Sequence, residues 1–80
     1  MHSLWTNINP SKPCFKFYDI ELDHDLFDAY VVTCRWGRIG SKKGRTKVMV
    51  FNSLDEALIH IKEIENVRIK HHYQKALKQN

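Results

Sequence analysis

The sequence Arg35-Trp36-Gly37-Arg38-Ile39-Gly40 lies between two runs of residues that favour β-strands. Tyr30 to Cys34 leads into it and Arg45 to Phe51 leads out, and both runs are rich in β-branched and aromatic side chains. The glycines of the chain all fall in this connection, at Gly37, Gly40 and Gly44, where they permit sharp backbone turns. We therefore expect these glycines to shape a loop at the mouth of a hairpin, with a tryptophan between two guanidinium groups.

Alternation along these two runs predicts which side chains share a face of the sheet, because successive residues of a strand point to opposite sides. A strand from Ala29 to Trp36 places Tyr30, Val32, Cys34 and Trp36 together, opposite Val31, Thr33 and Arg35. The returning strand from Arg45 to Phe51 places Arg45, Lys47, Met49 and Phe51 together, opposite Thr46, Val48 and Val50. Its basic residues thus point back towards the loop.

Upstream of the hairpin, Cys14 to Leu22 also reads as a strand, followed by a loop from Asp23 to Asp28. Apolar residues occupy both of its faces, so the strand is either buried on both sides or carries a bulge near Phe17 and Tyr18. Residues 1–13 are poorly defined, because two prolines follow the only strand-like run, Leu4 to Ile8. That run is expected at an edge or in a linker.

The last segment opens with a capping box, in which Ser53 can accept from the Glu56 amide while Glu56 reaches back. Apolar residues then recur at helical spacing, at Leu54, Ala57, Leu58, Ile61 and Ile64. A helix is expected from about 54 to 70 or beyond, and residues 69–78 either continue it or fold back. The predicted fold is one α+β domain over 1–80, with an antiparallel sheet of three to four strands and one long C-terminal helix.

Composition narrows the class of protein. Thirteen Lys and Arg against nine Asp and Glu give a net charge of +4, which suits a polyanionic partner. No apolar run approaches the roughly 20 residues of a membrane span, and no leader-like segment follows Met1, so an intracellular protein, cytoplasmic or nucleoid-associated, is expected without a membrane partner. Cys14 and Cys34 lack a disulfide-type spacing and are expected to be free, buried thiols.

Several ordered motifs together resemble a WGR domain, the module named for Trp-Gly-Arg. The resemblance runs from Lys16-Phe17-Tyr18 through Arg35 to Gly40 and Gly44 to Lys47, and then to the capped helix with Arg68 and Tyr73. Such domains are known in DNA-dependent poly(ADP-ribose) polymerases and in bacterial proteins that carry them alone or with other modules. The family fold, a small antiparallel sheet with one packed helix, agrees with the fold expected from the residues.

The resemblance implies a non-enzymatic module that binds DNA at ends, nicks or 5′ phosphates, with roles in strand-break recognition. In the polymerases the tryptophan of the motif, here Trp36, packs against the sugar of a terminal nucleotide, and Lys16 matches a lysine near the phosphates. The expected DNA-binding residues are Lys16, Arg35, Trp36, Arg38, Lys42, Lys43, Arg45 and Lys47. Phe15 and His72 depart from the family pattern, which often has Asn and Gly there.

Other interpretations remain open at this point. Trp36 could be a core residue at a strand end, and Arg38 could pair with Asp25 or Asp28. The loop could instead dock on a partner protein, or bind single-stranded nucleic acid. No nucleophile elbow or phosphate-cradling motif suggests catalysis, and no cofactor is expected. Neighbouring His71 and His72 diverge by about 100° on a helix, so no metal site is expected.

Overall fold

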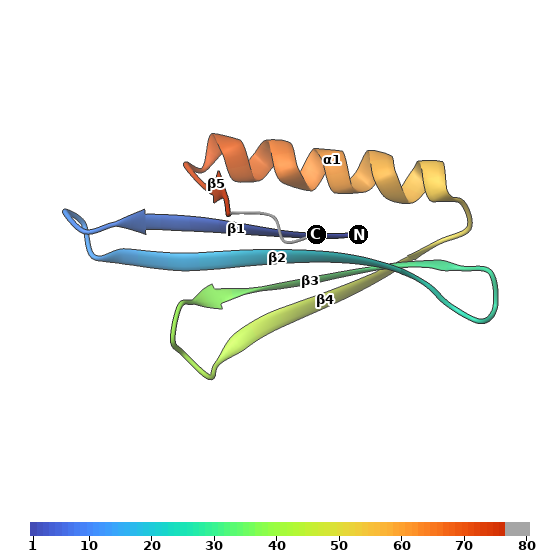
Figure 1. Cartoon of the computed structure of the whole chain (residues 1–80), viewed down its shortest axis with the longest axis horizontal. Coiled ribbons are helices and arrows are strands. Elements are labelled where there is room, and N and C mark those ends of the chain that lie inside the picture. The colour runs from blue at the N-terminus through green and yellow to red at the C-terminus, as the bar shows by residue number, and fades with distance from the viewer. Residues whose placement is uncertain (77–80) are drawn as a thin grey trace.

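The computed structural model describes residues 1–76 and shows a twisted antiparallel sheet with one helix lying across one of its faces (Figure 1). The strands are β1 (His2–Asn9), β2 (Cys14–His24), β3 (Tyr30–Arg38), β4 (Gly44–Phe51) and β5 (Gln74–Lys75), and the helix is α1 (Leu54–Lys70). Within the sheet their order is β4-β3-β2-β1-β5. The strands from β1 to β4 are therefore neighbours in the order of the chain.

The sheet has five strands rather than the three to four expected. The additional strand, β5, is a two-residue return of the chain after α1, where Gln74 and Lys75 pair with Thr6 and Trp5. So short a strand leaves no periodic signal in a sequence. The segment after the helix thus folds back, which decides between the two alternatives; Leu77 and Lys78 of that predicted segment lie outside the described residues.

The N-terminal segment is better defined than expected. β1 pairs with β2 along its whole length, from His2 opposite Glu21 to Asn9 opposite Cys14. It is therefore not a linker, and it lies near the edge of the sheet as expected, because β5 pairs on its other side only with Trp5 and Thr6. A turn over 10–13 accommodates both prolines outside the ladder.

β2 is regular, and its pairing continues in one register with β1 from Cys14 to Glu21 and with β3 from Lys16 to His24. No bulge interrupts it, and the other expected alternative, burial on both sides, is also wrong, because only one face of the strand is covered. Tyr18, Ile20 and Leu22 pack towards the helix, and Phe15 and Phe17 point to the other side. Phe15 and Phe17 do not belong to the core, because nothing in residues 1–76 covers that side.

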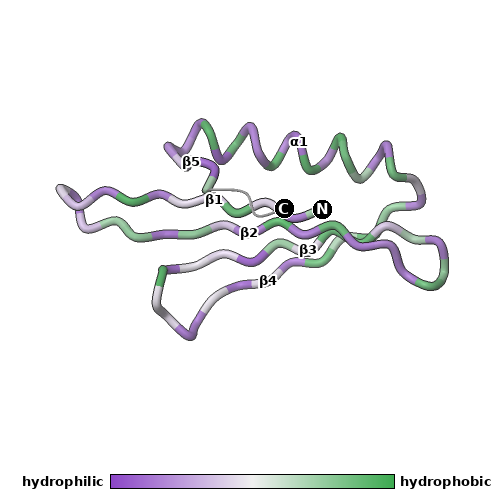
Figure 2. The backbone as a smooth tube through the Cα atoms, in the orientation of Figure 1, coloured by the Kyte–Doolittle hydropathy of each residue, from purple (hydrophilic) through white to green (hydrophobic). Residues whose placement is uncertain are grey.

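The core lies between α1 and the sheet and is built from Trp5, Ile20, Val32, Cys34, Ala57 and Ile61. Hydrophobic and hydrophilic residues alternate along the helix, so one stripe faces the sheet (Figure 2). The predicted cap is confirmed at its first hydrogen bond: the Glu56 amide donates to Ser53 Oγ at 3.1 Å. Leu54 and Leu58, expected in the stripe, are exposed.

The two cysteines are free, but only Cys34 is buried, while Cys14 is half-buried.

The sheet face away from α1 carries exposed apolar side chains, including Leu4, Val48 and Val50. Across residues 1–76, no helix has both the length and the apolarity needed to cross a membrane.

Candidate nucleic-acid interface

Two rows of side chains cross the sheet at the end where β3 meets the glycine-containing loop. Lys16 of β2 lies opposite Arg38 of β3, and Trp36 lies opposite Arg45 of β4. Directly opposed residues of antiparallel strands point to the same face, so Trp36 and Arg45 project on the side of the sheet that carries α1, and Lys16 and Arg38 lie next to each other where β3 ends. Register thus brings together a tryptophan and three cations from three strands.

Trp36 is half-buried at the margin of the core, with one side packed and the other open. Its indole stacks on the ring of Tyr18, with ring centroids 5.4 Å apart and planes inclined by 12°. Tyr18 lies opposite Trp36 in the β2–β3 ladder, so the strand register itself sets this stack. Trp36 therefore has part of the role of a core residue, while leaving apolar surface for a ligand.

Arg68 of α1 completes the support beneath this stack. Its guanidinium carbon lies 4.1 Å from the centroid of the Tyr18 ring and 5.2 Å from that of Tyr73. Such cation–π contacts contribute about 0.5–2 kcal/mol, with the larger values at desolvated sites. Nε of Arg68 is buried and has no hydrogen-bond partner within residues 1–76, so the two aromatic rings are its main environment. Arg68 fixes Tyr18, and Tyr18 orients Trp36.

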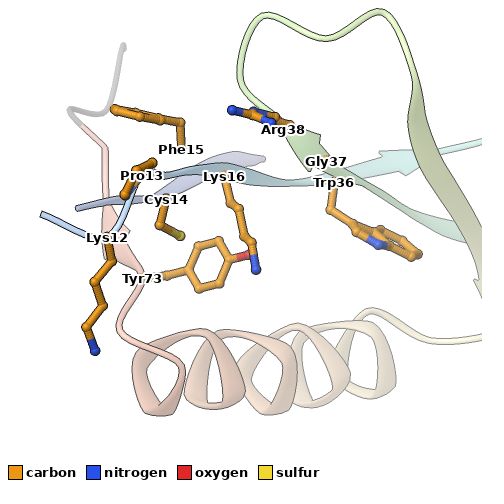
Figure 3. Close-up of a pocket in the computed structure, with 9 residues that line it drawn as sticks. All are labelled: Lys12, Pro13, Cys14, Phe15, Lys16, Trp36, Gly37, Arg38 and Tyr73. Carbon is orange, nitrogen blue, oxygen red and sulfur yellow. The ribbon is translucent and has the colours of Figure 1, made fainter. Parts of the chain in front are cut away.

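An open hollow of about 670 Å³ lies beside Trp36 (Figure 3). We call it the basic hollow, and it is lined by Lys12, Pro13, Cys14, Phe15, Lys16, Trp36, Gly37, Arg38 and Tyr73. Lys16, Trp36 and Tyr73 point towards the side of the helix, and Arg38 projects from the end of β3. Cations from the β1–β2 hairpin and from the end of β3 thus surround apolar and aromatic surface.

A smaller hollow of about 260 Å³ lies on the other side of Trp36, lined by Trp36, Gly37, Lys43, Gly44 and Arg45. Its shape depends on the absence of side chains at the two paired glycines. A Cβ on Gly37 would lie 3.2 Å from the Gly44 Cα, and one on Gly44 would lie 3.1 Å from the Trp36 carbonyl oxygen. Gly40 has φ +85°, a backbone conformation that residues other than glycine rarely adopt. Side chains at Gly37 and Gly44 would thus crowd backbone atoms, and one at Gly40 would be strained by its φ.

The structure does not bring every predicted site residue together. Arg35 points to the opposite face of the sheet, where its Nη1 lies 3.6 Å from Asp19 Oδ2. Lys42 lies exposed in the loop outside both hollows, and Lys47 lies on the same face as Arg45 but one row further from the loop. Lys16, Trp36, Arg38, Lys43 and Arg45 thus form the compact group. Arg38 has no ion-pair partner within residues 1–76, so the predicted alternatives with Asp25 or Asp28 are not formed.

Lys12 lines the basic hollow, although it is not among the residues predicted for the site. It lies in the turn between β1 and β2, and only the β2–β3 register carries that turn to the side of Arg38. Lysines between prolines are most often solvated turn residues, so the residue type alone carries no signal. A sequence-based search could have found Lys12 only by first fixing the order of the strands.

His72 adopts a left-handed backbone conformation, with φ 67°. It is the residue at which α1 reverses towards β5, and it is one of the two positions where this chain departs from the pattern of the family it resembles. Glycine adopts this conformation without steric cost, whereas a residue with a side chain does so at a cost of about 1–2 kcal/mol. The turn is retained because Tyr73 and β5 are packed on the sheet beyond it.

Burial raises the pKa of Tyr18 to about 12, and the Cys34 thiol next to it adds to the rise while Arg68 opposes it. Burial likewise raises the pKa of Cys34. A raised tyrosine pKa means that the folded state holds the proton more tightly than the unfolded state. The stability linked to this proton is therefore complete below pH 10 and is lost as the pH rises from 10 to about 12.

We therefore expect the urea midpoint of the protein to fall more steeply between pH 10 and 12 than that of Tyr18→Phe, which keeps the ring under Arg68 but lacks the proton. The two proteins differ only in this hydroxyl, so the difference between their profiles isolates Tyr18. Parallel pH profiles for the two proteins would show that the Tyr18 hydroxyl is not linked to folding.

Comparison with family models gives one match, to the WGR domain, over residues 1–80. The chain belongs to the WGR family. The predicted resemblance is thus confirmed over the whole chain. None of the curated proteins compared with the chain matches it. The WGR domain is a binding module and is not itself catalytic, and membership is consistent with binding to nucleic acid.

Clusters of side chains that could bind a metal ion are a second kind of site, besides the cations around Trp36. Within residues 1–76, no group of three or more His, Cys, Asp or Glu side chains is placed to hold a metal ion. His71 is the C-cap residue of α1, and the backbone reverses at His72. The two histidines therefore do not lie on one continuous helix. The concentration of cations around Trp36 remains the feature with the clearest chemistry.

Proposed function

We propose that this WGR domain binds DNA at ends, nicks or 5′ phosphates, with Trp36 against the sugar or base of the terminal nucleotide. The observation that carries the proposal is that one half-buried tryptophan separates two hollows, each with cations at its margin. In the proposed complex Lys16 and Arg38 contact phosphates on one side of Trp36, and Lys43 and Arg45 do so on the other. Lys12 extends the first group.

The location of Trp36 favours ends over continuous duplex. It lies near the limit of the sheet, where the loops 10–13 and 39–43 project beyond the strands (Figure 1). A terminal nucleotide exposes a sugar and a base face that a flat apolar ring can cover, whereas neighbouring base pairs cover these surfaces inside a duplex. Contacts to phosphate and sugar position a protein without reading bases, so little sequence preference is expected.

Support for the tryptophan is also consistent with ligand stacking. The Tyr18–Arg68–Tyr73 cluster holds one side of Trp36, so little side-chain entropy remains to be lost when a ligand covers the other side. A phosphate-rich ligand would be attracted by the surrounding cations from a distance, since the loops around Trp36 carry no acidic residue.

The proposal is tested by titrating labelled DNA of one sequence in three forms: a closed dumbbell without ends, the same dumbbell with one nick, and a stem-loop with one 5′-phosphorylated blunt end. We expect tighter binding to the nicked and blunt forms than to the closed form. If about four phosphates are neutralised, the logarithm of affinity falls with the logarithm of salt concentration at a slope of about −3 to −4.

Equal affinity for the three forms would contradict recognition of ends, and a slope near zero would contradict phosphate binding altogether. The latter result would favour the alternative of a module that docks on a protein through the Trp36 loop. A single-stranded competitor of the same length distinguishes binding of ends from general binding of single strands.

A further inference from the structure

The tip of the β2–β3 turn exposes two large apolar side chains at the end of the molecule opposite the basic hollow. Leu26 is 99% exposed and Phe27 is 89% exposed. Figure 2 shows hydrophobic residues at this turn with hydrophilic residues on both sides. Fully burying either side chain would contribute about 1.5–3 kcal/mol, so a small domain that leaves both in water forgoes a large part of its available apolar burial.

This tip is an ordered turn. One oxygen of the Asp25 carboxylate, Oδ1, accepts hydrogen bonds from the amides of Phe27 at 2.8 Å and Ala29 at 2.9 Å, and the Asp25 amide donates to the Ala29 carbonyl. Asp28 takes a left-handed conformation, with φ 62°, that closes the turn. Leu26 and Phe27 are therefore held outward by a defined backbone, as expected of a binding element.

The surroundings of the tip are acidic. Asp23 and Asp25 precede the two apolar residues, and Asp28 follows them. Nε2 of His24 lies 3.5 Å from Oδ1 of Asp28. The start of α1, with Asp55 and Glu56, lies at the same end of the molecule (Figure 1). The tip thus combines an exposed leucine and a planar ring with carboxylates on both sides.

The basic hollow has the complementary composition. Phe15, Trp36 and Tyr73 supply its apolar surface, and Lys12, Lys16 and Arg38 supply its cations. Its volume of about 670 Å³ falls within the range of about 300–1,000 Å³ for sites that accept compact organic groups. Leu26 and Phe27 together are small enough to enter such a site, and the neighbouring carboxylates would then meet the cations at its margin.

We propose that the Leu26–Phe27 tip of one molecule binds the basic hollow of a second copy of this chain. The tip and the hollow lie at opposite ends of a molecule 45 Å long, so the contact cannot form within one chain. It joins two different surfaces and is therefore heterologous, so it allows head-to-tail association. The inference does not depend on DNA binding, but DNA in the same hollow would compete with the second copy.

The test is sedimentation velocity at low salt over a range from about 10 μM to about 1 mM, which brackets the affinity of a small interface. The sedimentation coefficient of the wild type is expected to rise with concentration. Leu26→Ser/Phe27→Ser, which removes the tip, and Arg38→Glu, which reverses a charge at the hollow, are each expected to remain monomers. Ile59→Ser, which alters an exposed apolar residue on α1, should associate like the wild type.

The mixture of the two monomeric variants gives the decisive result. The tip variant retains an intact hollow and the Arg38→Glu variant retains an intact tip, so mixing them should yield a one-to-one dimer that cannot grow. A wild type that stays monomeric at all concentrations, a tip variant that associates like the wild type, or a mixture that remains monomeric would each overturn the proposal. The tip variant should bind DNA ends like the wild type, so loss of self-association and loss of DNA binding are separable outcomes.

Discussion

Trp36→Ala is expected to weaken binding to a blunt or nicked DNA by about 5- to 150-fold, because base–aromatic stacking contributes about 1–3 kcal/mol and each 1.4 kcal/mol is tenfold in affinity. The loss on the closed dumbbell should be much smaller, since continuous duplex offers no terminal nucleotide to cover. The measurement is the ratio of dissociation constants for nicked and closed forms. In the variant that ratio should approach one.

Trp36 also packs on Tyr18, so its removal affects the fold as well as the ligand. Truncating a buried tryptophan costs about 3–5 kcal/mol, and less is expected here because the ring is only half-buried. Trp36→Phe is the matched control: it keeps a ring on Tyr18 and should retain most of the stability with an intermediate loss of end preference. Equal weakening on both DNA forms by a folded Trp36→Ala would assign the residue to the core alone.

Arg38→Gln and Arg35→Gln form a matched pair, because the two arginines lie three residues apart on opposite faces of β3. A charge-assisted hydrogen bond contributes about 1.5–3 kcal/mol, so Arg38→Gln should lower DNA affinity by about 10- to 150-fold, nearer the lower value because the side chain is exposed. Losing one phosphate contact should also reduce the magnitude of the salt slope by about 0.9.

Arg35→Gln removes the same charge but from the side of Asp19, away from Trp36. Both variants lose the same long-range attraction, so the difference between their salt slopes reports the direct contact. Arg35→Gln is expected to keep the slope of the wild type. A larger effect at Arg35 than at Arg38 would place the DNA on the sheet face away from α1, contrary to the proposal.

Much of the fold could be predicted because its signals are local. Alternation predicted the faces of β3 and β4 correctly, since side chains in a strand alternate whatever lies next to it. The cap at Ser53 was predicted because the residues that form it lie within one helical turn. β5 could not be predicted, because a two-residue strand exists only where β1 already offers an edge. β1 was expected only at an edge or in a linker, because its pairing with β2 depends on residues elsewhere in the chain.

The sequence by itself determined the hairpin, its glycines, the helix start and membership in the WGR family. It also placed Trp36 and Arg38 among the candidate DNA-binding residues. Alternation already placed Arg35 on the face opposite Trp36, but only the tertiary structure decided which cations of the other segments lie beside Trp36. Arg35 and Arg38 are both basic and both adjacent to the motif, but strand geometry sends one to Asp19 and the other to the basic hollow. Lys12 and Tyr73 line the basic hollow beside Trp36, and Arg68 lies over the Tyr18 ring on which Trp36 stacks, although all three are far from Trp36 in the chain. Register and helix packing set these distances, and neither is encoded by any one segment alone.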